Sequence, residues 1–263
     1  MSSAIRWVLL LAVAALFALI FYNWYLQQQP PLLSPPSKSA PGPDVPAPPE
    51  PQSHFPVPEQ AEPKALPGLD ASDDTISNAL ASAIGDQALV RVLNLKAFVR
   101  NVVATIDNLP RRKLPQRLLP LQPAPGSFDI AGRDNDYHID ARNYQRYAPY
   151  IRVAADIDAG KLVTVYFRFY PLFQQAYQDL GYPKGYFNDR LVEVIDHLLA
   201  APEVPTPVKL VRPKVYYEFA DAELEQRSAG QKILIRIGPE NAAKVKAKLR
   251  EIRGDLTAAG PKR

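Results

Sequence analysis

The sequence predicts a mainly helical domain, α+β in class with one small β-hairpin element, placed after a single transmembrane helix and a disordered proline-rich linker. Three observations lead to this prediction. Residues 7–26 form a nearly unbroken apolar run, prolines crowd residues 27–67, and apolar side chains recur every three or four positions through residues 68–253. That last spacing places side chains on one face of an α-helix, whereas strict alternation would indicate β-strands.

The apolar run of residues 7–26 is predicted to be a membrane-spanning helix, with residues 1–6 ahead of it. It holds no charged residue, and at about 1.5 Å of rise per residue it reaches roughly 30 Å, the hydrocarbon thickness of a bilayer. A cleaved signal peptide is the alternative. Such a peptide has an apolar stretch of only ~7–15 residues and a small-residue cleavage site, whereas this run ends in bulky residues from Tyr22 to Tyr25.

Few charges orient this helix. Arg6 precedes it, and the first charge beyond it is Lys38. Because positive charges beside a membrane helix stay on the cytoplasmic side, the short N-terminus is predicted to be cytoplasmic. The C-terminal domain is then predicted to lie in the periplasm, with the protein a single-pass component of a bacterial inner membrane.

The linker over residues 27–67 is predicted to be disordered. Fourteen of the 28 prolines fall between Pro30 and Pro67, and no apolar periodicity accompanies them. Such a segment cannot bury enough surface to offset the entropy lost on ordering, and proline favours an extended polyproline II chain. The segment is predicted to be a passive spacer, and a docking ligand for a proline-recognising module is the alternative.

Residues 68–253 are enough chain for a single hydrophobic core. Apolar residues at helical spacing predict helices over residues 76–84 and 95–106. Pro110 ends the second helix, since proline cannot continue the backbone hydrogen-bond pattern. Five prolines between residues 110 and 125 then predict extended chain lying across the core.

The middle of the domain begins with a predicted β-hairpin over residues 128–139, built around a glycine-containing turn. Helical spacing resumes and predicts helices over residues 143–155 and 161–180. In the second of these, residues 163–170 have strand-like composition, and Pro171 is expected to kink a helix through it.

The last third of the domain is predicted from its capping residues. Asn188 is expected to cap a helix that ends near residue 199, and residues 208–219 are the best remaining strand region. Ser228 has capping-box spacing with a glutamine three positions later and predicts another helix. Pro239 is suited to the first turn of the final helix, and residues 254–263 form a basic tail.

The chain has few of the residue types that bind metals or cofactors. It has no cysteine, and outside the linker its only histidines are His138 and His197. No His-Glu-x-x-His, Gly-x-Ser-x-Gly, phosphate-binding loop or dinucleotide fingerprint occurs. The sequence therefore predicts no metal and no cofactor, and a role without catalysis is favoured over an enzyme.

One aromatic turn leads directly into a polar helix face. Asp189, Glu193, Asp196 and His197 fall at helical spacing on one face. Tyrosine combines a large apolar ring with a polar tip, which suits recognition of peptides or sugars. A solvated or ion-paired face, with the tyrosines in the core, is the alternative. The predicted binding residues are Tyr182, Tyr186, Asn188, Asp189, Arg190, Glu193 and His197.

Positive charge gathers at the C-terminal end. Residues 227–263 hold ten Lys or Arg against three acids. Such a run is suited to an anionic partner, either lipid headgroups or a cell-wall polymer, and a solvated final helix is the alternative. A nucleic acid partner is not expected, because the predicted topology places the domain outside the cytoplasm.

Several strings of residues resemble one bacterial family of unknown function, the one numbered 3014. The resemblance covers about residues 67–253 and implies a Gram-negative envelope protein with a membrane segment, a variable proline-rich linker and this domain. It implies no reaction and transfers no catalytic residue. The strings are Asp107–Pro110, Gln174–Tyr177, Leu180–Pro183, Gly185–Leu199, Tyr217–Asp221, Gly230–Lys232 and Gly238–Asn241.

These observations predict a membrane protein that presents a non-catalytic binding or scaffolding domain to an envelope protein or a cell-wall polymer, with the lipid bilayer bound through residues 7–26. A cell-envelope hydrolase or transferase is the alternative, with Glu193 or Asp189 as general acid or base. A third reading is a purely structural role, in which the domain only oligomerises.

Overall fold

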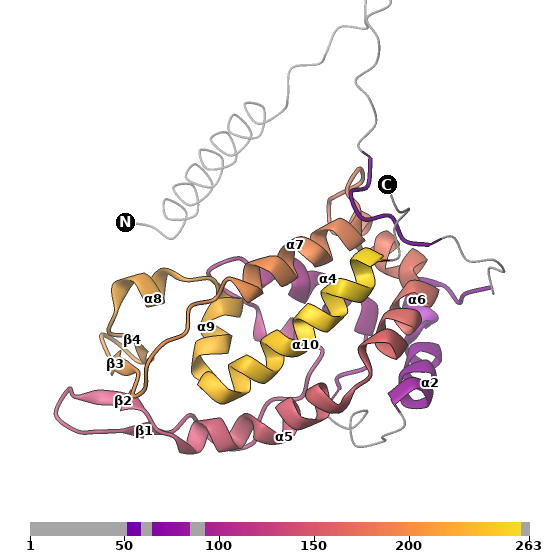
Figure 1. Ribbon diagram of the computed structural model, residues 1–263. Coiled ribbons are helices and arrows are strands. Elements are labelled where there is room, and N and C mark those ends of the chain that lie inside the picture. The colour runs from indigo at the N-terminus through magenta and orange to yellow at the C-terminus, as the bar shows by residue number, and fades with distance from the viewer. Residues whose placement is uncertain (1–51, 59–64, 85–92, 259–263) are drawn as a thin grey trace, which may run out of the picture. The chain divides into compact units, whose positions relative to one another are not determined.

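The computed structural model describes residues 52–58, 65–84 and 93–258, which Figure 1 draws in colour. The predicted transmembrane helix, most of the predicted linker and the last residues of the basic tail lie outside these ranges. Contacts divide the chain into two units, residues 1–50 and 51–263, and every described residue belongs to the second. No helix within the described ranges is long and apolar enough to cross a membrane.

Packed helices form the main body of the domain (Figure 1). They are α2 (Asp73–Ile84), α4 (Phe98–Asn108), α6 (Ala159–Asp179), α7 (Phe187–Leu199) and α10 (Pro239–Ala258). Helix α6 packs against each of the other four, and α10 also packs against α5 (Arg142–Asp156). The prediction of a mainly helical domain is confirmed.

Helix α6 runs without interruption through Pro171. The strand-like composition of residues 163–170 therefore does not decide the local structure. Along α6, Phe169 is fully buried and Phe173 is 7% exposed, so packing of this helical face outweighs the β-propensity of the residues between them. Helix α5 likewise continues through Pro149.

The described residues also contain a four-stranded antiparallel sheet in the order β1-β2-β3-β4. Strands β1 (Ile130–Ala131) and β2 (Tyr137–Ile139) confirm the predicted hairpin. The predicted strand region, residues 208–219, supplies two strands, β3 (Lys209–Val211) and β4 (Glu218–Phe219). Tyr137 pairs with Leu210 across β2 and β3, a contact between distant segments that local patterns do not specify.

Short helices complete the fold. They are the 3₁₀ turns η1 (Leu69–Ala71) and η2 (Gln116–Leu118), with α8 (Ala222–Gln226) and α9 (Ala229–Arg236). Ser228 caps α9 by accepting a hydrogen bond from the Gln231 backbone N–H at 3.2 Å, as predicted. The predicted cap of α7 is wrong, because Tyr186 occupies the N-cap position and Asn188 lies fully buried inside the helix.

Two groups of buried apolar residues meet inside the helical body. The first includes Val99, Phe169 and Phe187, and the second includes Val163 and Leu256. The side chains leave a cavity of about 320 Å³ that residues of both groups line.

Candidate functional site

The candidate site is built around the first turn of α7. Gly185 precedes the helix, and a Cβ there would come within 2.9 Å of the Tyr177 ring. Tyr186 has extended backbone, with φ −106° and ψ 122°, and Phe187 is then fully buried in the core. Asp189 follows in the first turn, where the partial positive charge of a helix N-terminus favours a carboxylate.

Asp189 binds a segment that is distant in sequence. Its carboxylate accepts hydrogen bonds from the Ser53 hydroxyl at 3.0 Å and from the backbone N–H groups of His54 at 2.9 Å and Phe55 at 2.8 Å. The neighbouring Asn188 donates from Nδ2 to the Phe55 carbonyl at 2.7 Å. Two adjacent side chains therefore hold the main chain of residues 53–55, which fall within the predicted linker.

Asn188 connects this docked segment to the core. Its Oδ1 accepts a hydrogen bond from the Tyr166 hydroxyl at 3.1 Å. Burial raises the pKa of Tyr166 well above its ordinary value, so the hydroxyl keeps the proton that it donates. Gln174 braces the same turn, since its side chain donates to the Gly185 carbonyl at 2.7 Å and accepts from the Phe187 backbone N–H at 2.8 Å.

A hollow of about 480 Å³ lies beside the docked segment. The segment forms part of its wall, and α7 forms most of the rest. Aromatic rings stand next to charged groups in this wall, a combination that fits a ligand with both apolar and polar parts. The lining residues are His54, Phe55, Tyr177, Tyr186, Asp189, Arg190, Val192, Glu193 and Asp196.

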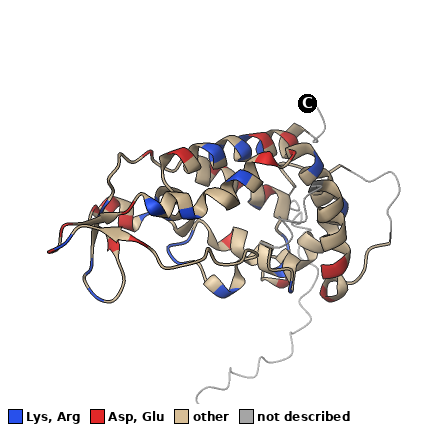
Figure 2. Ribbon diagram, turned by 90° about the horizontal axis from the view of Figure 1, so that it is seen from below, with Lys and Arg blue, Asp and Glu red and all other residues tan. Residues whose placement is uncertain are grey.

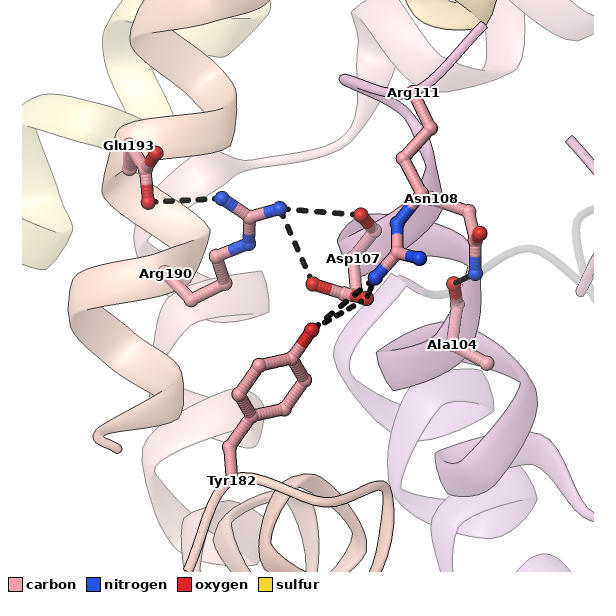
Figure 3. A network of polar contacts seen from close by, with 7 residues as sticks. All are labelled: Ala104, Asp107, Asn108, Arg111, Tyr182, Arg190 and Glu193. Atoms are coloured by element: carbon pink, nitrogen blue, oxygen red, sulfur yellow. Dashed lines mark hydrogen bonds and ion pairs between the residues drawn. The ribbon is translucent and has the colours of Figure 1, made fainter. Parts of the chain in front are cut away.

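A buried carboxylate on α4 joins α4 to α7, as Figure 3 shows. Asp107 is 2% exposed and pairs with Arg190 at 3.1 Å and with Arg111 at 2.5 Å. Tyr182 donates its hydroxyl to the same carboxylate at 3.3 Å. Arg190 also donates to Glu193 at 2.9 Å. The network therefore ties together α4, α7 and the turn between α6 and α7.

Arg190 belongs both to this network and to the wall of the hollow. Burial alone would lower the pKa of Arg190, but its hydrogen bond to Glu193 and the charges of Glu193 and Asp107 raise it above the ordinary value. The guanidinium is therefore a fixed positive charge. Its Nε is buried and has no hydrogen-bond partner in the described part of the chain, which leaves one donor to be satisfied.

The structure gathers most of the predicted binding residues in one place. Tyr186, Asp189, Arg190 and Glu193 line the hollow, as does Asp196. Asn188 donates a hydrogen bond to the docked segment. Tyr182 stacks on Tyr177, with ring centroids 4.6 Å apart, and its hydroxyl joins the Asp107 network.

His197 lies apart from the predicted site. Its Nε2 is 2.8 Å from the Ser228 hydroxyl, at the start of α9. Asp196 is paired with Arg253 of α10, at 2.5 Å between Oδ1 and Nε. The helix face predicted from spacing is thus divided, since its last residue packs against another helix. Within the described ranges, no group of three or more His, Asp or Glu side chains is placed to hold a metal ion.

Several basic residues near the C-terminus make contacts within the domain. Lys246 is buried and donates to the Ala201 carbonyl at 2.6 Å, and Lys248 donates to the Ile157 carbonyl at 2.7 Å. Figure 2 shows basic and acidic residues interleaved along the helices in this view. Two of the basic residues on the last helix are therefore engaged within the domain, while Lys244 and Arg250 are exposed.

Two parts of the site were not predicted. Asp107 lies in the string Asp107–Pro110, and the signal that marks it is a carboxylate at helical spacing from the apolar Val99 and Val103. The docked residues 53–55 carry no such signal, because serine, histidine and phenylalanine in a proline-rich tract also fit a solvated linker. Only the complementary groups on α7 identify them.

Comparison with known proteins gives one match. The model of a family described as "Protein of unknown function (DUF3014)" matches residues 98–253. No curated protein and no solved structure matches the chain. Asp107, Tyr182 and Arg190 fall within the matched residues, whereas the docked segment precedes them.

Proposed function

The chain belongs to the DUF3014 family of proteins of unknown function, and from that premise we propose that it is a single-pass inner-membrane protein whose periplasmic domain binds a peptide segment of another envelope protein. Binding does not involve catalysis in this proposal. The hollow beside the first turn of α7 is the binding site, and the docked residues 53–55 form one of its walls.

The membrane placement rests on the sequence. The uncharged run of residues 7–26 matches the thickness of a bilayer, and the scarcity of flanking charge before Lys38 leaves Arg6 to fix the orientation. The proline-rich residues that precede the docked segment then give the domain reach from the membrane surface.

One observation supports peptide binding most strongly. Asp189 and Asn188 form hydrogen bonds with the main chain of residues 53–55. Backbone N–H and C=O groups are common to every peptide, so a carboxylate and an amide placed in this way recognise a chain rather than a particular side chain. The first turn of α7 is therefore chemically suited to peptides, and the contact with the docked segment supports this mode of binding.

The remaining wall has groups for a second peptide. Arg190 places a fixed positive charge in this wall, which suits a carbonyl or carboxylate oxygen of a partner segment. Tyr186 is 38% exposed beside it, and aromatic rings are frequent anchors at protein interfaces. In this proposal a partner segment lies along α7, next to residues 53–55, and contacts both side chains.

The other functions receive less support. For a wall polymer with negative charge, Lys244 and Arg250 are exposed on α10, but Lys246 and Lys248 are engaged within the domain. A hydrolase or transferase needs carboxylates that reach the substrate. The oxygens of Asp189 are engaged by the docked segment, and Glu193 is paired with Arg190.

Site-specific photocrosslinking in intact cells tests this proposal. A photoreactive amino acid replaces Tyr186 in the full chain, and in a matched control it replaces Tyr216, which is 80% exposed and lies outside the hollow. We expect a discrete crosslinked envelope protein from position 186 and none from position 216. Adding Asp189→Ala is expected to abolish the crosslink, because the wall formed by residues 53–55 loses its anchor.

Asp196→Ala serves as the control for this second step, since Asp196 lines the hollow but pairs with Arg253 rather than with the docked segment. It should leave the crosslink in place. A crosslink that survives Asp189→Ala, or that appears equally from both positions, would contradict the proposed site. Crosslinking only to a second copy of the chain would favour the structural role instead.

A further inference from the structure

The apolar cavity inside the helical body is the second feature that suggests a ligand. It measures about 320 Å³ and is partly open rather than sealed. Helices α2, α4, α6, α7 and α10 all contribute to it, and α6 places Phe169 and Phe173 in its wall. The hollow at the first turn of α7 is a separate space, since the two share no lining residue.

The wall of this cavity presents no polar surface. Tyr166 is the one lining residue with a polar side-chain atom, and its hydroxyl is engaged with Asn188 at 3.1 Å. A water molecule in a protein interior needs two to four polar partners, which this wall does not offer. The cavity therefore suits an apolar occupant and excludes sugars, nucleotides and ionised groups from its interior.

The size of the cavity narrows the class of occupant further. An engineered apolar cavity of about 150 Å³ stays dry and binds benzene, and the present cavity has about 320 Å³, roughly twice that volume. This is room for a flexible hydrocarbon chain. A chain is also the shape that fits a space bounded by several long helices.

We propose that this cavity binds a single hydrocarbon chain, that of a fatty acid or of a membrane lipid. The chain lies between the two groups of buried apolar residues. Its polar head stays outside, because the cavity offers that head no partner.

The open side is expected where the lining is least covered. Leu162, Leu191 and Ile252 line the cavity but are only half-buried. They come from α6, α7 and α10, and half-buried lining residues also lie on α4, among them Val102 and Ile106. The proposal does not depend on peptide binding at the neighbouring hollow, and either one can fail without the other.

Photolabelling of the full chain in membranes tests the proposal. The first probe is a fatty acid with a photoreactive group in its chain and a terminal alkyne for recovery. The second is a phospholipid that carries the same chain. We expect adducts on peptides of α6, α7 or α10 that contain cavity-lining residues. Labelling by the fatty acid alone would identify a free acid as the source, and labelling by the phospholipid would identify a lipid chain.

Substitutions that fill the cavity provide the specific control. Val194 lines the cavity from α7 and is 1% exposed. Val194→Phe should lower labelling of these peptides at least about fourfold, because each methylene of the ligand that the ring excludes reduces affinity roughly fourfold. Val102→Phe enters from α4 and is the second variant in case the first does not fold. Val211→Phe makes the same change at an exposed position on β3 and should leave labelling unchanged.

Three results would overturn the proposal. One is the absence of adducts on the cavity peptides of the unsubstituted chain. Another is labelling confined to residues 7–26, which would reflect contact with the bilayer alone. The third is undiminished labelling in a cavity-filling variant whose far-ultraviolet circular dichroism shows it to be folded. Because the readout is the position of the adduct, it is independent of the crosslink expected at Tyr186.

Discussion

At the residue scale, two aspartates have different structural roles. Asp107 is buried and holds α4 against α7 through Arg190, whereas Asp189 faces outwards and holds residues 53–55. Each carboxylate accepts several hydrogen bonds, which offsets the cost of its partial removal from water. The first contributes to the fold and the second to the surface that the fold presents.

The Asp107 network predicts unequal effects for its two arginines. The Arg190 side chain is 19% exposed and that of Arg111 is 55% exposed, although both bind the same carboxylate. Arg190→Ala should lower the free energy of unfolding by about 3 kcal/mol, because it leaves a buried charge less compensated. Arg111→Ala should cost below about 1 kcal/mol, as expected for a solvent-screened pair.

Chemical denaturation followed by far-ultraviolet circular dichroism measures both arginine variants. Equal losses would mean that burial does not determine the strength of these pairs. A smaller loss for Arg190→Ala than for Arg111→Ala would mean that Arg111 is the principal partner of Asp107.

At the scale of elements, α7 has two ends with different tasks. Its first turn carries the groups that bind residues 53–55, and its last turn places His197 against Ser228 of α9. The apolar residues between them, including Val192 and Ile195, are buried. The helix is thus fixed along its length, so the binding groups at its start are held in a defined geometry.

The junction of β4 with α8 and α9 is predicted to be sensitive to acid. Glu225 pairs with Lys232 at 2.7 Å and accepts from the Phe219 backbone N–H at 2.9 Å. Burial alone would raise the pKa of Glu225, but these hydrogen bonds and the charges of Lys232 and Arg236 lower it below 4.5. The unfolded chain therefore binds a proton more readily, and this contribution to stability is lost as the pH falls from about 4.5 through the lowered pKa.

Glu225→Gln tests this dependence. The variant should be less stable than the unsubstituted chain near neutral pH, and the gap should close as the pH falls below about 4.5. Thermal unfolding at a series of pH values measures the gap. Glu223→Gln changes an exposed neighbour and should show little effect at any pH, so a gap that stays constant for Glu225→Gln would refute the assignment.

Two glycines at the ends of α10 predict opposite effects of alanine. Gly254 lies exposed within the helix, and a Cβ there meets no atom within 4 Å. Gly254→Ala should stabilise the domain by roughly 0.5–1 kcal/mol, because alanine loses less backbone entropy. Gly238 precedes the helix with φ +89°, and a Cβ there would lie 2.5 Å from the Tyr144 ring.

Gly238→Ala should therefore destabilise the domain by more than about 1 kcal/mol, through backbone strain and overpacking together. Melting temperatures of the two variants, each compared with the unsubstituted chain, provide the test. A shift in the same direction for both would show that backbone conformation and space at these positions do not control stability.

At the scale of the whole molecule, the proposed topology can be tested directly because the chain has no cysteine. Single cysteines at Ser3 and Lys184 report on the N-terminus and on an exposed turn of the domain. A membrane-impermeant maleimide should label Lys184→Cys once the outer membrane is permeabilised, and Ser3→Cys only after lysis. The opposite pattern would reverse the proposed orientation, and labelling of both before lysis would refute an inner-membrane anchor.

The sequence by itself determined the elements whose causes are local. Helical spacing, the Ser228 cap and the Pro239 start place the beginnings of α9 and α10 correctly, although α10 continues to Ala258 into the predicted tail, and the turn near Gly132 places the β1–β2 hairpin. These features depend on residues within a few positions of one another, so their backbone preferences and hydrogen bonds can be recognised in the order of amino acids.

Only the tertiary structure decided which distant segments of the chain contact one another. The pairing of Asp107 with Arg190, the docking of residues 53–55 on Asp189 and the addition of β3 to β2 join segments that are distant in sequence. The same packing removed His197 from the predicted site and left the apolar cavity between helices. These outcomes depend on how side chains share the space between elements, and no local spacing specifies that arrangement.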